Sequence, residues 1–311
     1  MKILEIKNLS KKFGNFKAVD NINLSVEEGE VYGLLGPNGA GKSTTINMIC
    51  SLLSPSEGEI LIFGDKISKK SKEIKKKIGI VPQDIAIYED LTALENTMFF
   101  GSIYGLKGKV LKEKAMKALE FVGLKEKAKS FPSKFSGGMK RRLNIACALV
   151  HEPKLIIMDE PTVGIDPQSR NHILESIKKL NSNGATIIYT SHYMEEVEAI
   201  CTKIAIIDKG KVIAEGTKEE LKNNFKDFNK LIITSNNEIK INLEDLKEID
   251  GVEVVTLKGN ILEINHSIEN DNLNSILSYL MNNKISIKEI EKTTVDLETV
   301  FLNLTGKKLR D

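Results

Sequence analysis

The chain has 311 residues, a length that favours two domains, and its composition is that of an ordinary globular protein. Its 45 basic and 43 acidic residues leave a net charge of +2, which excludes a strongly basic nucleic-acid binder. No apolar run reaches the roughly 18–20 residues that a membrane-spanning helix needs. The three cysteines are far apart and show no C-x-x-C spacing, which favours a reducing compartment over a disulfide framework.

Strand and helix patterns alternate over residues 1–220. Residues 1–7 alternate apolar and charged side chains, as a half-buried strand does. Four later runs are apolar and β-branched, which is typical of strands buried on both faces of a parallel sheet; they span residues 31–35, 155–158, 186–189 and 204–207. A capping box, Thr-Ala-Leu-Glu, opens a predicted helix over 92–104, and apolar spacing predicts another over 139–150. This alternation predicts an α/β fold with a parallel sheet.

The last part of the chain has a different composition. Only three of the 22 glycines lie beyond residue 220, and the charge balance changes there from basic to acidic. Lys, Asn and Glu dominate residues 216–229, which are predicted to be a linker. The elements predicted after it are a strand (231–234), a short helix (243–249), a hairpin (252–257 and 261–265), a helix (273–280), a strand (285–290) and a final helix (297–304). Their βαββαβ order predicts a small α+β domain, ferredoxin-like, over residues 221–311.

A phosphate-binding loop is the strongest motif in the chain. Residues 36–43, Gly-Pro-Asn-Gly-Ala-Gly-Lys-Ser, match G-x-x-x-x-G-K-[ST] and lie between a predicted strand and the helical run 44–53. The backbone N–H groups of such a loop and of the following helix attract phosphate. Lys42 is expected to neutralise the β- and γ-phosphates, and the Ser43 hydroxyl to ligate Mg²⁺. A simple glycine-rich turn is the alternative, and the strand–loop–helix context disfavours it.

Polar residues follow other strands at the sheet edge where this loop should lie. Asp159 is suited to hold Mg²⁺ through water, and Glu160 to orient and polarise the attacking water. His192 could contact the γ-phosphate or that water, although a single histidine is more often structural. Gln83 could touch Mg²⁺ or water, but a lone glutamine is uninformative. A pair of solvated acids is the alternative for Asp159 and Glu160.

A second anion site is predicted at the start of the helix near residue 140. Ser136, Gly137 and Gly138 precede this helix, so a hydroxyl and free N–H groups would meet there. One chain with one phosphate loop has no obvious use for a second site. A head-to-tail dimer has one, because this site can close over the nucleotide held by the other subunit.

Together these motifs resemble the nucleotide-binding subunits of ABC transporters, over about residues 1–220. The resemblance implies a P-loop NTPase ABC cassette, with a RecA-like core, an antiparallel β subdomain and a helical subdomain. It implies ATP contacts from Phe13, which would stack on adenine, and from Gly36, Pro37, Asn38, Gly39, Ala40, Gly41, Lys42, Ser43, Thr44 and Gln83. It implies catalytic roles for Glu160 and His192, Mg²⁺ binding by Ser43, Gln83 and Asp159, contact with the partner's ATP by Ser136, Gly137 and Gly138, and a D-loop at Asp166.

Residues 135–139, which match the signature motif of this family, indicate which subfamily the chain resembles. Phe135 and Met139 replace the commonest Leu and Gln, which removes one hydrogen-bonding side chain near the partner's nucleotide. This version is similar to those of subunits that serve ABC-2-type multidrug and antibiotic exporters. The stretches 91–106 and 297–306 point the same way.

The resemblance implies an ATPase that uses ATP and Mg²⁺ to power transport, with export favoured, through a separate transmembrane permease. It would act as a homodimer or heterodimer on the cytoplasmic face of the cell membrane, and its permease contact is expected between Gln83 and Phe135. No nucleic acid is expected, because the lysine-rich segment 66–77 contains no aromatic residue and is better read as a solvated face. The alternatives are a soluble ABC-type ATPase acting on ribosomes or DNA, and an importer ATPase with a regulatory tail.

Overall fold

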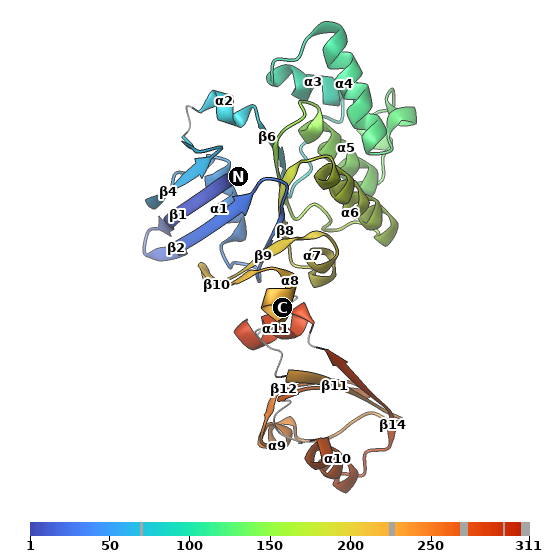
Figure 1. Ribbon diagram of the computed structural model, residues 1–311. Coiled ribbons are helices and arrows are strands. Elements are labelled where there is room, and N and C mark those ends of the chain that lie inside the picture. The colour runs from blue at the N-terminus through green and yellow to red at the C-terminus, as the bar shows by residue number, and fades with distance from the viewer. Residues whose placement is uncertain (69–70, 224–227, 268–272, 295, 306–311) are drawn as a thin grey trace. The chain divides into compact units, whose positions relative to one another are not determined.

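A computed structural model describes residues 1–68, 71–223, 228–267, 273–294 and 296–305 (Figure 1). These residues form two compact units, one whose described part is Met1–Gly216 and one within Thr217–Lys308. Each unit has its own sheet or sheets and its own apolar core. No helix in the described ranges is long and apolar enough to span a membrane.

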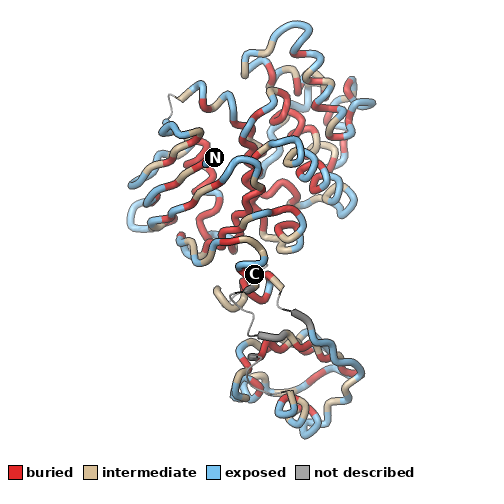
Figure 2. The backbone as a smooth tube through the Cα atoms, viewed as in Figure 1, coloured by how far each residue is buried: buried red, intermediate tan, exposed pale blue. Residues whose placement is uncertain are grey.

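A six-stranded sheet lies at the centre of the first unit, in the order β10-β9-β3-β8-β7-β6. All its neighbours are parallel except the β9–β10 pair. The strands are β3 (Val31–Leu35), β6 (Ile78–Val81), β7 (Leu155–Asp159), β8 (Thr186–Ser191), β9 (Lys203–Asp208) and β10 (Lys211–Gly216). Every residue of β3 and β8 is buried, which confirms the prediction of parallel strands covered on both faces (Figure 2).

An antiparallel sheet, in the order β2-β1-β4-β5, shares one apolar core with the central sheet. Its strands are β1 (Lys2–Phe13), β2 (Phe16–Glu27), β4 (Glu57–Ile62) and β5 (Asp65–Lys66). The strand predicted over residues 1–7 therefore continues to Phe13. A tight hairpin after it places Phe13 opposite Phe16.

Helices surround these sheets. They are α1 (Lys42–Ile49), α2 (Lys72–Lys75), α3 (Ala93–Ile103), α4 (Gly108–Phe121), α5 (Gly137–Leu149), α6 (Pro167–Ser182) and α7 (Met194–Ile200), with 3₁₀ turns at Lys125–Lys127 and Pro132–Lys134. The capping box predicted before α3 is confirmed: Thr92 Oγ1 accepts from the Glu95 N–H at 3.3 Å, and Glu95 Oε2 accepts from the Thr92 N–H at 2.8 Å.

The second unit contains one antiparallel sheet, in the order β12-β13-β11-β14. Its elements are α8 (Lys218–Asn223), β11 (Phe228–Ser235), α9 (Leu243–Lys247), β12 (Val252–Lys258), β13 (Ile261–Ser267), α10 (Leu273–Asn282), β14 (Ile287–Thr294) and α11 (Leu297–Thr305). From β11 to β14 the elements follow the order βαββαβ. Buried apolar residues of the inner strands, such as Ile233 of β11, share one core with Leu246 of α9 and Ile276 of α10.

The linker prediction for residues 216–229 is wrong in its first half, because α8 forms there; residues 224–227 lie outside the described part. The Thr217 N–H donates to Glu220 Oε2 at 2.8 Å, and Thr217 Oγ1 accepts from the Glu220 N–H at 3.1 Å. This capping box supplies partners for two N–H groups of the first turn, and Leu221 is buried behind it. The pattern Thr-x-x-Glu-Leu was present in the sequence and would have predicted the helix.

Candidate active site

The loop between β3 and α1 folds around the Lys42 side chain. Lys42 Nζ donates to the carbonyl oxygens of Gly36, at 2.7 Å, and Pro37, at 3.2 Å, and the residue is 5% exposed. Gly41 has φ 106°, and a Cβ there would lie 2.6 Å from the carbonyl oxygen of Ala18. This position therefore requires glycine for both its conformation and its surroundings.

The N-terminus of α1 is open to a ligand. Gly41 is its N-cap and has no side chain to accept a hydrogen bond from the first turn. The free N–H groups of this turn, together with the helix dipole, favour an anion. Ser43, in the same turn, is exposed, so its hydroxyl is accessible beside these N–H groups.

Three side chains from distant parts of the chain converge on the Glu160 carboxylate, which is 6% exposed. Lys42 Nζ lies 3.8 Å from Oε1, and Gln83 Nε2 and His192 Nδ1 lie 3.5 Å and 3.3 Å from Oε2. The His192 contact lacks hydrogen-bond geometry. These long contacts leave room for small adjustments when a ligand enters. The structure therefore brings together Lys42, Gln83, Glu160 and His192, as the motifs predict.

Thr190 fixes the two acids at the end of β7. Its Oγ1 donates to Asp159 Oδ1 at 2.6 Å and accepts from the Glu160 N–H at 2.9 Å. Glu160 has φ 46°, which is unusual for a residue other than glycine and turns its side chain off the strand direction. Thr190 lies opposite Asp159 in the parallel pairing of β7 and β8. Nothing local in the sequence marks this cross-strand contact, so the role of Thr190 could not be predicted from it.

Burial and nearby acids act in opposite directions on Lys42. Burial lowers the pKa of its ammonium group, while the Glu160 and Asp159 carboxylates partly oppose this. No group of three or more His, Cys, Asp and Glu side chains suited to a metal occurs among the described residues. A Mg²⁺ ion held by a hydroxyl, a carboxylate and substrate phosphates does not need such a group. The oxygen donors of Ser43 and Asp159 fit that description.

A cavity of about 300 Å³ opens above the loop. It is lined by Phe13, Phe16, Ala18, residues 38–44, Gln83 and Glu160. The exposed rings of Phe13 and Phe16 form its apolar side, which suits a flat base. Sequence analysis missed Phe16, although the pattern Phe-Gly-Asn-Phe marks a hairpin that carries two aromatic rings.

Arg141 connects the Gln83 loop to α5. Its Nη1 and Nη2 donate to the carbonyl oxygens of Pro82, at 2.8 Å, and Gln83, at 2.6 Å. The guanidinium group is buried, which lowers its pKa. Arg141 was also missed, because an arginine in the pattern Lys-Arg-Arg gives no sign that one of its members turns inward.

A different cavity, of about 690 Å³, is lined by Ser136, Met139, Arg142, Asp166 and residues of α6. Ser136 Oγ accepts from the Met139 N–H at 3.3 Å and caps α5, and Asp166 Oδ1 accepts from the Ser169 N–H at 2.9 Å and caps α6. A Cβ on Gly138 would lie 2.1 Å from Ser169 Oγ, so α5 and α6 can approach only at a glycine. Ser136 and the phosphate loop of its own chain therefore line different cavities.

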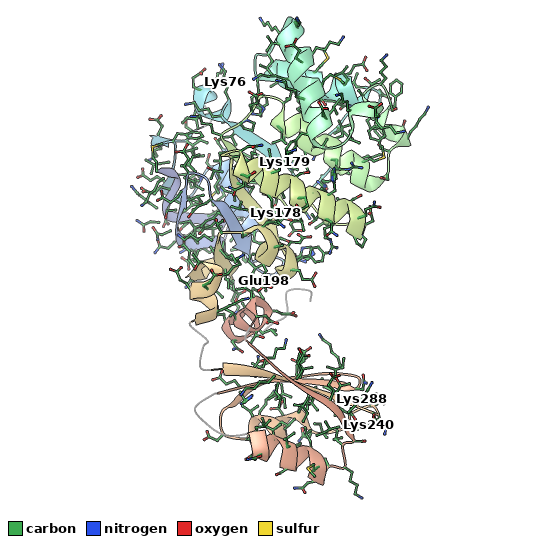
Figure 3. The ribbon with its side chains drawn as sticks, turned by 45° about the vertical axis from the view of Figure 1, so that its right-hand side comes forward. Lys76, Lys178, Lys179, Glu198, Lys240 and Lys288 are labelled. Carbon is green, nitrogen blue, oxygen red and sulfur yellow. The ribbon has the colours of Figure 1, made fainter. Side chains whose placement is uncertain are left out.

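The lysine-rich segment forms local ion pairs. Lys66 Nζ lies 3.1 Å from Glu59 Oε2, and Lys76 Nζ lies 2.8 Å from Glu73 Oε1. Lys76, labelled in Figure 3, is at the outer surface of the first unit. These paired, exposed lysines are typical of a solvated face. Residues 69 and 70, which belong to the same segment, lie outside the described part of the chain.

Comparison with known proteins gives consistent matches. A family model described as "ABC transporter" matches residues 19–163. The linearmycin resistance ATP-binding protein LnrL of Bacillus subtilis is 47% identical over 99% of this chain and 100% of its own. A Nod factor export ATP-binding protein I of Cupriavidus metallidurans is 36% identical over 99% of both. A dimeric ATP-binding cassette in a post-hydrolysis state, bound to ADP and Pi, matches 69% of this chain and 98% of its own with a TM-score of 0.63 and 32% identity.

Proposed function

The chain belongs to the ABC transporter family, and we propose that two such subunits close over two ATP molecules, each between residues 36–44 of one and 136–138 of the other. As an ATP-binding subunit of this family, the chain hydrolyses ATP to drive transport. The convergence of Lys42, Gln83 and His192 on the Glu160 carboxylate is the main support for the site, since it joins three sequence motifs around one acid.

Each residue has one task in the proposed reaction. Lys42 gives up its hydrogen bonds to the carbonyl oxygens of Gly36 and Pro37 and contacts the β- and γ-phosphates instead. Glu160 orients a water molecule and takes its proton as the water oxygen bonds to the γ-phosphorus and the bond to the ADP oxygen breaks. His192 contacts the γ-phosphate and steadies the charge that develops there. ADP, phosphate and one proton are the products.

Ligand contacts complete the proposal. Ser43, Gln83 and Asp159 would hold Mg²⁺, which neutralises phosphate oxygens when bound. Phe13 would stack on adenine, and the backbone of residues 36–44 would surround the phosphates. Asp166, which lines the same cavity as Ser136 and lies near Gly138, would be at the dimer interface.

The separation of the two cavities supports a shared site. Ser136 lines one cavity and Lys42 the other, so Ser136 can reach a bound nucleotide only from a second subunit. To shift the equilibrium between open and closed dimers from 1:99 to 99:1, ATP must bind the closed dimer about 5.5 kcal/mol more strongly than the open one. Hydrogen bonds to charged groups contribute about 1.5–3 kcal/mol each, so a few contacts from the second subunit suffice.

The partner that this subunit drives is proposed to be a membrane permease, with the chain on its cytoplasmic side. The proposed contact lies between Gln83 and Phe135, where Tyr88, Phe99 and Ile103 are 50%, 39% and 62% exposed. The Tyr88 and Phe99 ring centroids lie 5.0 Å apart, so they form one apolar surface. Export is favoured over import, because two relatives are named for linearmycin resistance and for Nod factor export.

The change Glu160→Gln tests this mechanism. It keeps the size of the side chain but removes its charge, so ATP should still bind and trap the dimer while the hydrolysis rate falls at least about 100-fold. The dimer is measured by light scattering and hydrolysis by phosphate release. Glu152→Gln is the matched control, since Glu152 also has a positive φ, 55°, but lies exposed beside Lys114. Undiminished hydrolysis by Glu160→Gln would remove Glu160 from the proposed role.

A further inference from the structure

Glu196, in α7, is a buried acid that the proposed reaction does not use. It is 1% exposed, and its Oε2 accepts three hydroxyl hydrogen bonds. The donors are Tyr189 at 2.7 Å, Thr162 at 2.8 Å and Ser191 at 2.9 Å. Burial, and then the neighbouring carboxylate, raises the pKa of Tyr189 well above its usual range, so its hydroxyl remains a donor. Three hydroxyl donors on one oxygen atom are the arrangement that an ionised carboxylate satisfies best.

Arg170 supplies the opposite charge. Its Nε lies 3.4 Å from Glu196 Oε1, an ion pair without hydrogen-bond geometry, and its guanidinium carbon lies 4.6 Å from the Tyr193 ring centroid. A buried carboxylate needs such an opposite charge. Arg170 stands one turn into α6, the helix that Asp166 caps. The carboxylate thus joins α6, α7 and β8.

Two of the three hydroxyl donors, Thr162 and Ser191, lie close in sequence to residues of the active site. Thr162 comes two residues after Glu160, on the loop that leaves β7. Ser191 precedes His192, and its Oγ also accepts from the Tyr193 N–H at 2.9 Å, which closes the turn around the histidine. Glu196 Oε2 therefore anchors both the loop that carries Glu160 and the turn that carries His192.

We propose that Glu196 is a positioning residue of the ATPase site: its carboxylate fixes the turn carrying His192 relative to the loop carrying Glu160. The inference rests on the proposed function. The 3.3 Å separation between His192 Nδ1 and Glu160 Oε2 is the geometry that these anchors hold. Without the charge, Arg170 loses its partner and the turn is free to move, while the cavity above the phosphate loop is untouched.

The change Glu196→Gln in the full chain tests the proposal. Glutamine keeps the length and one acceptor oxygen, but replaces the charge that faces Arg170 with an amide. With Mg·ATP, kcat should fall at least tenfold per bound nucleotide, while the Kd for a fluorescent ATP analogue stays within twofold. Glu195→Gln is the matched control, because Glu195 is the preceding residue of α7 and is exposed. It should leave both quantities unchanged.

Two outcomes would overturn the inference. One is a parent-like kcat in Glu196→Gln. The other is a loss of turnover that only matches a loss of nucleotide-binding sites, which would make Glu196 a residue of the fold alone. If Glu196→Gln does not fold, Ser191→Ala keeps the ion pair and removes both the link between Glu196 and the histidine turn and the acceptor of the Tyr193 N–H within that turn. It should lower kcat severalfold at unchanged Kd, and an unchanged kcat would count equally against the proposal.

Histidine NMR separates this inference from the proposed function. The chain has only four histidines, so the imidazole signals of ¹³C-labelled protein can be resolved, and that of His192 assigned by its loss in His192→Ala. Glu196→Gln should shift or broaden the His192 signal and leave that of His151 in place. A parent chain without ATP hydrolysis would refute the proposed function. An unmoved His192 signal would refute the positioning role, whatever the hydrolysis rate.

Discussion

Two helices of the first unit begin at sites suited to anions: α1 follows the phosphate-binding loop, and α5 follows Ser136. The N-termini of these two helices differ. At α1 the cap is a glycine, the first turn has no side-chain acceptor, and a buried lysine lies beside it. At α5 the cap is Ser136, whose own oxygen already takes the Met139 N–H. The first end has charge and open donors; the second has a hydroxyl and a close helix contact at Gly138.

A helix N-terminus suited to anions can therefore serve two purposes. An open N-terminus with a lysine can hold phosphate alone, because the backbone donors and the charge act together. A self-capped N-terminus is weaker, because Ser136 already takes one donor and the nearby Arg142 donates to the Val122 carbonyl oxygen, but it can add contacts to a phosphate that another subunit holds. Two substitutions and a pH series test this contrast.

The largest effect is expected from Lys42→Ala. Each charge-assisted hydrogen bond contributes about 1.5–3 kcal/mol, so the loss of the lysine should weaken ATP binding by at least about 100-fold. Isothermal titration with ATP measures this. Lys66→Ala, which removes an exposed lysine paired with Glu59, should leave the affinity unchanged. Equal affinities for the parent and Lys42→Ala would contradict the contrast between the two helix ends.

A smaller effect is expected from Gly138→Ala. The new Cβ would meet Ser169 Oγ at 2.1 Å, so the free energy of unfolding should fall by about 1–3 kcal/mol. Chemical denaturation measures it, and ATP binding by the single subunit should persist. Gly137→Ala is the control, since nothing lies within 4 Å of a Cβ there. A second change, Ser169→Gly, should restore most of the lost stability; if it does not, the close contact is not the cause.

The smallest effect concerns pH. The pKa of Lys42 is lower in the folded chain than its usual 10.5, so the unfolded chain binds more protons between these two values. The free energy of unfolding should therefore rise with pH in that window, as the buried charge is lost. Lys42→Met, which has no charge there, should show a smaller rise. Denaturation at a series of alkaline pH values measures both; identical slopes would show that burial costs Lys42 nothing.

Local patterns predicted much of this molecule. The strand at residues 31–35 matches β3, and the helix predicted over 92–104 corresponds to α3, because apolar runs and caps act over a few residues. The phosphate loop could be identified for the same reason. Contacts across the chain could not be. Thr190 and Arg141 act on groups far from them in sequence, as Glu196 does on Thr162 and Arg170, and nothing beside any of them marks these partners.

The roles of single residues likewise depend partly on local pattern and partly on contacts across the chain. The sequence placed Glu160 at the end of a strand, but its positive φ and its three distant neighbours follow from the sheet and from the loops around it. Phe16 shows a mixed case: the hairpin was readable, but its place on the cavity depends on how the antiparallel sheet meets the loop.

The capping box at Thr217 has a practical consequence for anyone who wishes to cut the gene in two. A C-terminal fragment that starts at residue 221 would lack both Thr217 and Glu220 and would keep only residues 221–223 of α8. Losing such a cap costs about 1 kcal/mol, a large share of the stability of a small fragment. A fragment that starts before Thr217 keeps the helix intact, so expression trials should place the junction at Gly216.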